Sequence, residues 1–173
     1  MCAKASNGVK DFFGILVSRL NARLFIEALS DDLVYSEPAE SLQSVRTSLQ
    51  TKNVVVLGGL QPGQSITAVA ALCAEYVKAS KIIFSTDVDG VFTADPRKDP
   101  EAKLLPQATY DELDALTSGP NTLPGEYRLI DGVALTILRR SKIYAQILKG
   151  SEQNILKAAA GEPVGTLIVD QKK

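Results

Sequence analysis

Short runs of aliphatic and β-branched residues alternate with helix-length segments in this sequence, and this alternation constrains the fold more than any other feature. The predicted strands are residues 53–57, 81–85, 143–148 and 166–169. The predicted helices that separate them are residues 66–79, 130–140 and 151–160. A helix that connects two strands carries the chain back to the end of the sheet at which the first strand began, so the two strands run parallel. The pattern therefore predicts an α/β protein with a mainly parallel central sheet.

The amino-terminal part of the chain predicts two further helices. Residues 9–29 carry apolar side chains at every fourth position, which is typical of an amphipathic helix. Arg19 and Arg23 fall on the flank of this helix, either as part of a solvated face or as a contact for a ligand or subunit. A second, more polar helix is expected at residues 39–49.

Length, charge and missing residue types narrow the class of protein. The 173 residues suit one ordinary domain, so we expect a single domain over residues 1–173. The chain has no histidine, which excludes Ser-His-Asp and Cys-His catalysis and histidine-ligated zinc. A net charge of −1 gives no basic field for nucleic acid, and no apolar stretch reaches the roughly 18 residues of a membrane span. Cys2 and Cys73 form no C-x-x-C motif, which fits a reducing environment. We therefore expect a cytoplasmic protein that binds neither nucleic acid nor membranes.

A glycine-rich segment, residues 58–65 (GGLQPGQS), connects a predicted strand to a predicted helix. Glycines let backbone N–H groups approach a ligand, and the start of a helix carries a partial positive charge, so such a loop suits an anion. The segment matches neither the P-loop nor the dinucleotide-binding pattern. By its residues alone, it is either an anion site or a structural turn.

A second polar segment, residues 85–97, directly follows a predicted strand, where ligands of α/β sheets bind. Asp87 and Asp89 could hold Mg²⁺, accept hydrogen bonds or cap a turn. The position of Gly90 excludes an EF-hand. The same residues imitate the first motif of haloacid-dehalogenase-type phosphatases, with Asp87 as nucleophile and Asp89 as acid and base, although no convincing acidic pair follows downstream.

The whole run of residues 86–100, with residues 102–103 and 109–113, resembles the uridylate (UMP) kinases of the amino-acid kinase superfamily. Further segments are similar to the archaeal branch of that family, in the right order: residues 11–15, 18–22, 58–65, 68–72, 125–131, 140–143 and 161–166. The resemblance covers nearly the entire chain from Val9 onward. It implies a three-layer αβα sandwich around a mainly parallel sheet.

The resemblance also assigns residues to sites. Asp11 resembles the carboxylate that binds the UMP ribose, and Asp131 resembles the catalytic aspartate near the transferring phosphate. The residues that resemble the acceptor-nucleotide loop are Leu60, Gln61, Pro62, Gly63, Gln64, Ser65 and Ile66. Those that resemble the ATP-binding positions are Thr86, Asp87, Phe92 and Asp95. No residue is assigned as a metal ligand.

The implied function is ATP-dependent phosphorylation of UMP to UDP in pyrimidine nucleotide biosynthesis, with Mg²⁺ accompanying ATP. The nucleotides UMP and ATP are the implied partners, and the resemblance implies a homo-oligomer, a hexamer. Two alternatives stay open: a non-catalytic protein of the same fold that binds nucleotides or assembles with partners, and the phosphatase that uses Asp87 and Asp89.

The sequence departs from the family pattern at several positions. Thr136 stands where many archaeal relatives carry Lys, Phe92 replaces the usual Tyr, and Asp87 replaces Asn or Lys. The family opens with a strand that carries a Lys and a Gly-Gly-Ser turn, and later has a Gly-Gly-Gly loop with an Arg. This chain begins downstream of both, like the C-terminal three quarters of a UMP kinase. Because these groups neutralise the phosphates, we expect low turnover from the chain alone, and unpaired backbone groups near residues 54–57.

Overall fold

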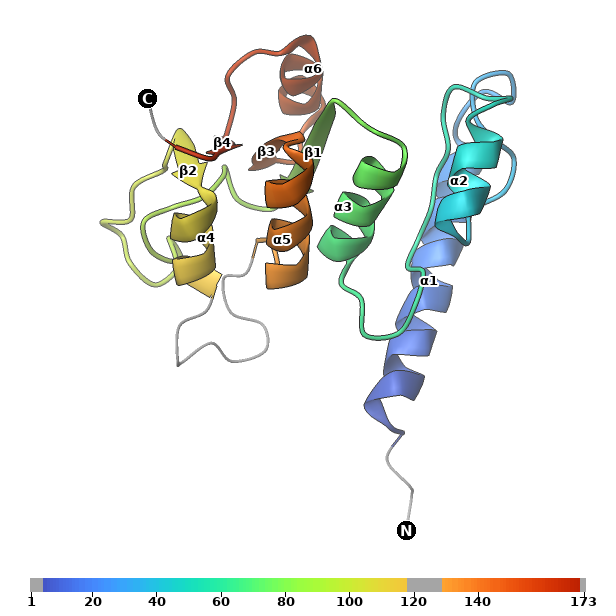
Figure 1. The fold of residues 1–173 in the computed structure, drawn as a ribbon, viewed down its shortest axis with the longest axis horizontal. Coiled ribbons are helices and arrows are strands. Elements are labelled where there is room, and N and C mark those ends of the chain that lie inside the picture. The colour runs from blue at the N-terminus through green and yellow to red at the C-terminus, as the bar shows by residue number, and fades with distance from the viewer. Residues whose placement is uncertain (1–4, 118–128, 172–173) are drawn as a thin grey trace. The chain divides into compact units, whose positions relative to one another are not determined.

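The computed structural model describes residues 5–117 and 129–171 and divides into two compact units, Met1–Val77 and Lys78–Lys173. Figure 1 shows helices throughout and a sheet in the second unit. The fold is mixed α/β, as predicted. The single domain over residues 1–173 stays a prediction. The three-layer arrangement also stays a prediction.

The first unit contains three helices, α1 (Asn7–Glu27), α2 (Leu42–Ser48) and α3 (Ile66–Tyr76). The long predicted helix is confirmed as α1, which starts two residues early because the Ser6 side chain caps it. The predicted second helix, residues 39–49, is shorter, since Ser41 and Ser44 form a capping box that sets the start of α2. The helix predicted over residues 66–79 ends at Tyr76, and Lys78 has a positive φ of 57°.

The buried strand predicted at residues 53–57 is wrong. The segment forms two isolated parallel bridges, Val34 with Val54 and Ala39 with Leu57, and the side chains of residues 54–57 are half-buried. Between these bridges the partner segment advances five residues, while residues 54–57 advance three. The two segments therefore fall out of register, and no continuous pairing forms along them.

The second unit contains a four-stranded sheet in the order β1-β3-β4-β2. The strands are β1 (Lys81–Thr86), β2 (Gln107–Thr109), β3 (Tyr144–Lys149) and β4 (Thr166–Val169). Three of them confirm predicted strands, whereas the three-residue β2 was not predicted. The pairs β1–β3 and β2–β4 are parallel, and β3–β4 is antiparallel. The sheet is thus mainly parallel, with one reversal that the alternating pattern did not predict.

Three helices accompany this sheet: α4 (Tyr110–Thr117), α5 (Gly132–Ser141) and α6 (Glu152–Ala160). In Figure 1, α4 and α5 lie side by side in front of the sheet. Helix α6 is confirmed with both predicted ends, since Ser151 caps its start and Gly161 follows its end with φ 89°. The loop predicted at residues 117–125 lies almost wholly outside the described residues.

The register of the strands puts one apolar row on a single face of the sheet. Phe84 pairs with Ile147, and Ile168 pairs with both Ala145 and Ala108. All five side chains are at most 8% exposed. Since side chains alternate between the faces of a strand, this row lies on one face of the sheet, and Gln146 and Leu148 of β3 are buried on the other face. No helix among the described residues is both long and apolar enough to span a membrane.

Thr166 ties the sheet to the segment that follows β1. Its side chain is fully buried, and its Oγ1 accepts a hydrogen bond from the Val91 N–H at 2.8 Å and donates one to the Leu105 carbonyl at 2.5 Å. A Cβ atom on Gly90 would lie 2.6 Å from this oxygen, so only glycine permits the approach. One hydroxyl thus joins β4 to two loop segments.

We expect Thr166→Val to lower the free energy of unfolding by about 2 kcal/mol, because it leaves the buried Val91 N–H and Leu105 carbonyl without a partner. Thr136→Val is the matched control. The exposed Thr136 hydroxyl only donates to the Gly132 carbonyl of its own helix, so its loss should change stability by less than about 0.5 kcal/mol. Urea unfolding followed by circular dichroism measures both. Equal losses in the two variants would contradict the role assigned to Thr166.

Candidate functional site

The glycine-rich loop of the first unit borders a pocket of about 380 Å³ against α1. The residues that line it are Lys10, Asp11, Gly14, Ile15, Ser18, Gly59, Gln61, Gln64, Ser65 and Ile66. The predicted acceptor-nucleotide residues are therefore brought together in part: Asp11, Gln61, Gln64, Ser65 and Ile66 line the pocket. Leu60, Pro62 and Gly63 belong to the same loop without lining it. The loop thus connects two elements and also borders this pocket.

Asp11 joins the helix to the loop directly. Its Oδ2 accepts a hydrogen bond from the Gly63 backbone N–H at 2.9 Å, between residues that are 52 positions apart. Gly63 has φ 81°, a conformation that side chains with a Cβ rarely adopt, while the space around it is open. A carboxylate and a loop that were predicted separately thus form one site, and no sequence pattern predicted the bond between them.

The loop leads into the amino-terminal end of α3. The Ser65 side chain caps this helix by accepting from the Ala68 N–H at 2.9 Å. The partial positive charge of the helix end therefore adjoins the pocket on the side where Ser65 and Ile66 line it. The pocket offers a carboxylate to hydroxyl groups and a helix end to an anion, which are the two polar requirements of a nucleoside phosphate.

The predicted ATP-binding residues lie in the second unit, on the segment that follows β1. Thr86 ends the strand, and its hydroxyl donates to Asp87 Oδ1 at 3.1 Å. Asp87 and Asp89 are both exposed, whereas Phe92 is half-buried and forms a bridge with Leu104. The segment combines partly exposed polar groups with one aromatic side chain.

Asp95 lies in a turn that Arg97 closes. Its Oδ1 accepts hydrogen bonds from the Arg97 backbone N–H and from the Arg97 Nε, each at 3.1 Å. These bonds and the positive charge of the guanidinium hold the pKa of the Asp95 carboxyl below its ordinary value of 3.8, and the backbone hydrogen bond is the largest cause. Asp95 is therefore a carboxylate at neutral pH.

Asp131, the predicted catalytic residue, caps α5. Its Oδ1 accepts from the backbone N–H groups of Val133 at 2.7 Å and Ala134 at 3.0 Å. This cap explains why the helix starts at Gly132 and not at residue 130 as predicted. Two backbone donors fix the carboxylate at the positive end of the helix.

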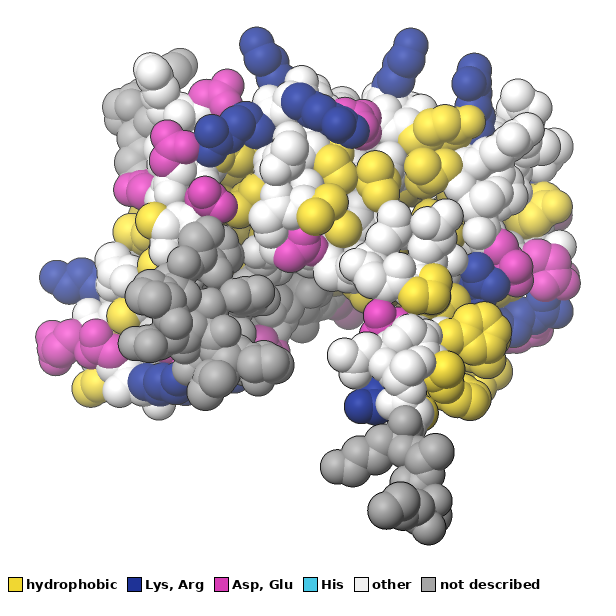
Figure 2. All heavy atoms as spheres, turned by 60° about the horizontal axis from the view of Figure 1, so that its bottom comes forward, with side chains coloured by type: hydrophobic (Ala, Val, Ile, Leu, Met, Phe, Trp, Pro, Cys, Tyr) yellow, Lys and Arg dark blue, Asp and Glu magenta, His cyan; other side chains and the backbone are white. Residues whose placement is uncertain are grey.

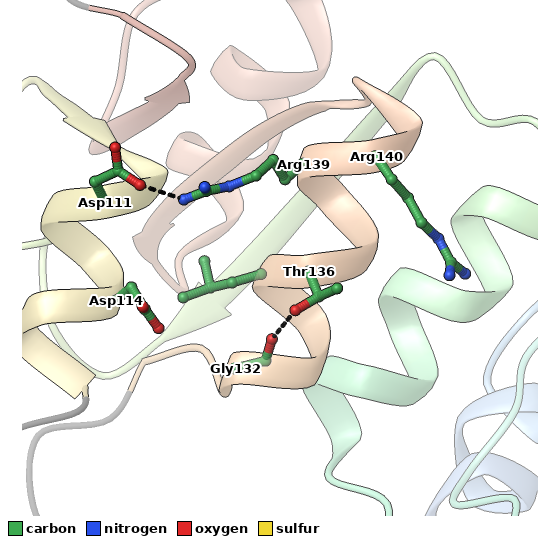
Figure 3. A pocket seen from close by; sticks show the side chains of 7 residues that line it. Asp111, Asp114, Gly132, Thr136, Arg139 and Arg140 are labelled. Atoms are coloured by element: carbon green, nitrogen blue, oxygen red, sulfur yellow. Dashed lines mark hydrogen bonds and ion pairs between the residues drawn. The ribbon is translucent and has the colours of Figure 1, made fainter.

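A second pocket, of about 550 Å³, lies between α4 and α5 and was not predicted. It is lined by Asp111, Asp114, Gly132, Leu135, Thr136, Arg139 and Arg140. Figure 3 shows Arg139 reaching across to Asp111, at 2.5 Å, while Arg140 points away from both aspartates. Arg139 also lies over the ring of Tyr110, 5.5 Å from its centre. No pocket was predicted here because the eight-residue α4 was not predicted.

Groups of acidic or cysteine side chains that could bind a metal ion are absent from the described residues. Over residues 5–117 and 129–171, no three Asp, Glu or Cys side chains lie together as a group that could hold a metal ion.

Comparison with known proteins identifies relatives across almost the whole chain. The model of the amino acid kinase family matches residues 2–149. The uridylate kinase of Hyperthermus butylicus is 42% identical over 160 residues, which are 92% of this chain and 70% of that protein. The uridylate kinase of Methanocella arvoryzae is also 42% identical, over 88% of this chain and 68% of its own length.

Solved structures agree with the sequence relatives. The crystal structure of uridylate kinase from Archaeoglobus fulgidus superimposes with a TM-score of 0.86 and 36% identity, over 95% of this chain and 74% of that one. The UMP kinase structure from Bacillus anthracis has a TM-score of 0.78 at 22% identity, which supports the fold alone. The predicted α/β fold with a mainly parallel central sheet is confirmed, and the relatives do not favour the phosphatase that would use Asp87 and Asp89.

We expect the Asp95 carboxyl to titrate below its ordinary pKa of 3.8, and Arg97→Ala to raise that pKa only in part, because the backbone N–H of residue 97 remains. Since the folded pKa lies below the unfolded one, the contribution of Asp95 to stability is complete above about pH 4 and is lost as the pH falls through the folded value. Carbon-13 NMR of the Asp95 carboxyl carbon measures both proteins. An unchanged titration in Arg97→Ala would contradict the role of the guanidinium.

Proposed function

This chain belongs to the amino acid kinase family, and within it to the uridylate kinases, and we propose that it transfers the γ-phosphoryl group of ATP to UMP, giving UDP and ADP. One observation carries the proposal for this particular chain. Asp11 and the loop at residues 58–65 form one pocket, although they are far apart in the sequence. The family resemblance assigns these same residues to UMP.

The pocket of the first unit is the proposed UMP site. Its volume of about 380 Å³ falls within the range of roughly 300–1,000 Å³ that small-molecule pockets occupy. The Asp11 carboxylate would accept hydrogen bonds from the ribose hydroxyls, and such charge-assisted bonds are stronger than neutral ones. The loop and the capped start of α3 supply N–H groups at the same pocket.

The segment after β1 is the proposed ATP site. Phe92 would offer an aromatic face to the base, while Thr86, Asp87 and Asp95 supply polar contacts. Mg²⁺, held by phosphate oxygens, would offset the negative charge that phosphoryl transfer concentrates on the phosphates. The described residues offer no separate metal cage, which fits a cation that accompanies the nucleotide.

Asp131 is the proposed catalytic residue of the second unit. In the transfer, an oxygen of the UMP phosphate forms a bond to the γ-phosphorus while the bond from that phosphorus to the β–γ bridging oxygen breaks. Phosphoryl transfer depends mostly on positioning and on charge stabilisation. The two backbone bonds that hold Asp131 keep its carboxylate in one orientation, as a positioned group requires.

We propose further that the enzyme serves pyrimidine nucleotide synthesis in the cytoplasm and assembles into homo-oligomers, hexamers by resemblance to its family. The apolar surface of α1 supports self-association, and Figure 2 shows apolar side chains gathered at the lower right, over the start of this helix. The large apolar side chains of α1 that are 44–63% exposed are Val9, Phe12, Phe13, Leu16, Val17, Leu20, Leu24 and Phe25. Light scattering in solution would measure the assembly's mass.

The UMP site is tested with Asp11→Asn. Asn can still accept the Gly63 N–H bond, so the loop stays attached, but the charge that strengthens bonds from the ribose is lost. We expect the dissociation constant for UMP to rise about tenfold, and that for deoxy-UMP, which lacks the 2′-hydroxyl, to rise less. Calorimetric titration of both nucleotides measures this.

The control for this experiment is Asp32→Asn, which removes the same charge from an exposed residue of the first unit outside the pocket. It should leave both affinities unchanged. Failure of the unaltered chain to bind UMP would overturn the proposed function. Equal losses for UMP and deoxy-UMP in Asp11→Asn would leave the pocket in place and reject the ribose contact.

The catalytic proposal is tested with Asp131→Asn. Asn caps a helix about as well as Asp does, so the melting temperature should fall by no more than about 2 °C. We expect UDP formation from UMP and Mg-ATP to fall about tenfold or more, with UMP affinity unchanged, because only the carboxylate charge is removed. A coupled assay for UDP measures the rate. No UDP formation by the unaltered chain, despite UMP and ATP binding, would favour the nucleotide-binding alternative.

A further inference from the structure

The loop at residues 58–65, the acceptor loop, is hydrogen-bonded to α1 near its beginning as well as at Gly63. The Gly59 backbone N–H donates to Ser18 Oγ at 2.8 Å, and the Ser18 hydroxyl donates in turn to the Ile15 carbonyl at 2.8 Å. The next residue of the helix, Arg19, donates from its Nε to the Gly59 carbonyl at 3.2 Å. Two consecutive side chains of α1 therefore bind the N–H and the carbonyl of one loop residue.

The loop backbone also lies directly on the helix backbone at this point. A Cβ on Gly58 would lie 2.7 Å from the Arg19 nitrogen, and a Cβ on Gly59 would lie 2.9 Å from Ile15 Cγ1. Both glycines are buried. Because neither backbone can move closer and the hydrogen bonds prevent separation, the position of the loop on α1 is closely defined.

Arg19 is held by a second partner. Its Nη1 forms an ion pair with Glu40 Oε2 at 3.0 Å, while its own side chain is only 22% exposed. A guanidinium is planar and presents several N–H groups, so it can bind the Gly59 carbonyl and the Glu40 carboxylate together. Glu40 thereby orients the group that holds the loop.

The pocket lies beside both attachments. Ser18 and Gly59 line it together with Asp11, Gln61 and Gln64, whereas Arg19 does not line it. Any effect of Arg19 on a bound nucleotide must therefore act through the loop. In binding sites, a displacement of about 1 Å is enough to weaken contacts substantially.

We infer that Arg19, with Ser18 and Glu40, is a positioning residue that sets the place of the acceptor loop relative to Asp11 and so determines the affinity for UMP. This inference rests on the proposed function, since it assumes that UMP occupies the pocket of the first unit. ATP binding, on residues of the second unit, is not expected to depend on these contacts.

Arg19→Met tests the inference, because it keeps an unbranched apolar stem and removes every N–H donor. We expect the dissociation constant for UMP to rise about tenfold, a free-energy change of about 1.4 kcal/mol, and that for ATP to change less than twofold. Amide hydrogen exchange at Gly59 should also become faster. Arg19→Lys, which keeps the charge for Glu40 but lacks the planar group, should lose less UMP affinity than Arg19→Met.

Arg23→Met is the matched control. Arg23 lies one helical turn from Arg19, pairs with Glu27 and Glu37, and donates to the Ser36 carbonyl at 3.0 Å, and none of these partners belongs to the loop. It should leave UMP affinity unchanged. A loss of UMP affinity in Arg23→Met equal to that in Arg19→Met would overturn the inference, as would unchanged UMP affinity in Arg19→Met. Failure of the unaltered chain to bind UMP would instead overturn the proposed function.

Discussion

The contact between α1 and the loop at residues 58–63 is the interaction on which the proposed UMP site depends. Among its described residues, the first unit has no regular strand. Hydrogen bonds from the backbone N–H groups of Gly59 and Gly63 to side chains of one helix attach its loop to α1. Glycine is required at both points, for close approach at Gly59 and for a positive φ at Gly63. These glycines thus allow the loop to lie against α1.

The second unit is organised around a sheet. Its strands share one buried apolar row, and Thr166 bonds the sheet to two loop segments. Thr86 ends β1 and Asp131 caps α5, so these two proposed residues are attached to regular elements, whereas Asp87, Phe92 and Asp95 lie on the segment that follows β1. Sites built on regular elements hold their side chains more firmly than sites on loops, which is why the acceptor loop needs additional attachments.

The sequence predicted the elements that carry strong periodicity and missed those that do not. Helix α1 and strands β1, β3 and β4 were predicted, but β2 and α4 are too short for their periods to show. The β-branched run at residues 53–57 has strand propensity, yet the longer partner segment falls out of register with it and leaves two bridges. Propensity describes a segment alone, whereas pairing depends on the residues that face it.

For the site, the resemblance to a family supplied the residues, and the structure supplied the bonds between them. Sequence alone could not separate Arg19 from Arg23, since both lie on one flank of α1 and both carry the same charge. Only the fold brings Gly59 to one and not to the other. Nothing in the structure explains the departure at Thr136, whose hydroxyl donates to a carbonyl of its own helix and adds no positive charge. The cations of α5 are Arg139, which is paired with Asp111, and Arg140. The amino-terminal end of this helix carries a partial positive charge, and there the Asp131 carboxylate is already held by two backbone N–H groups.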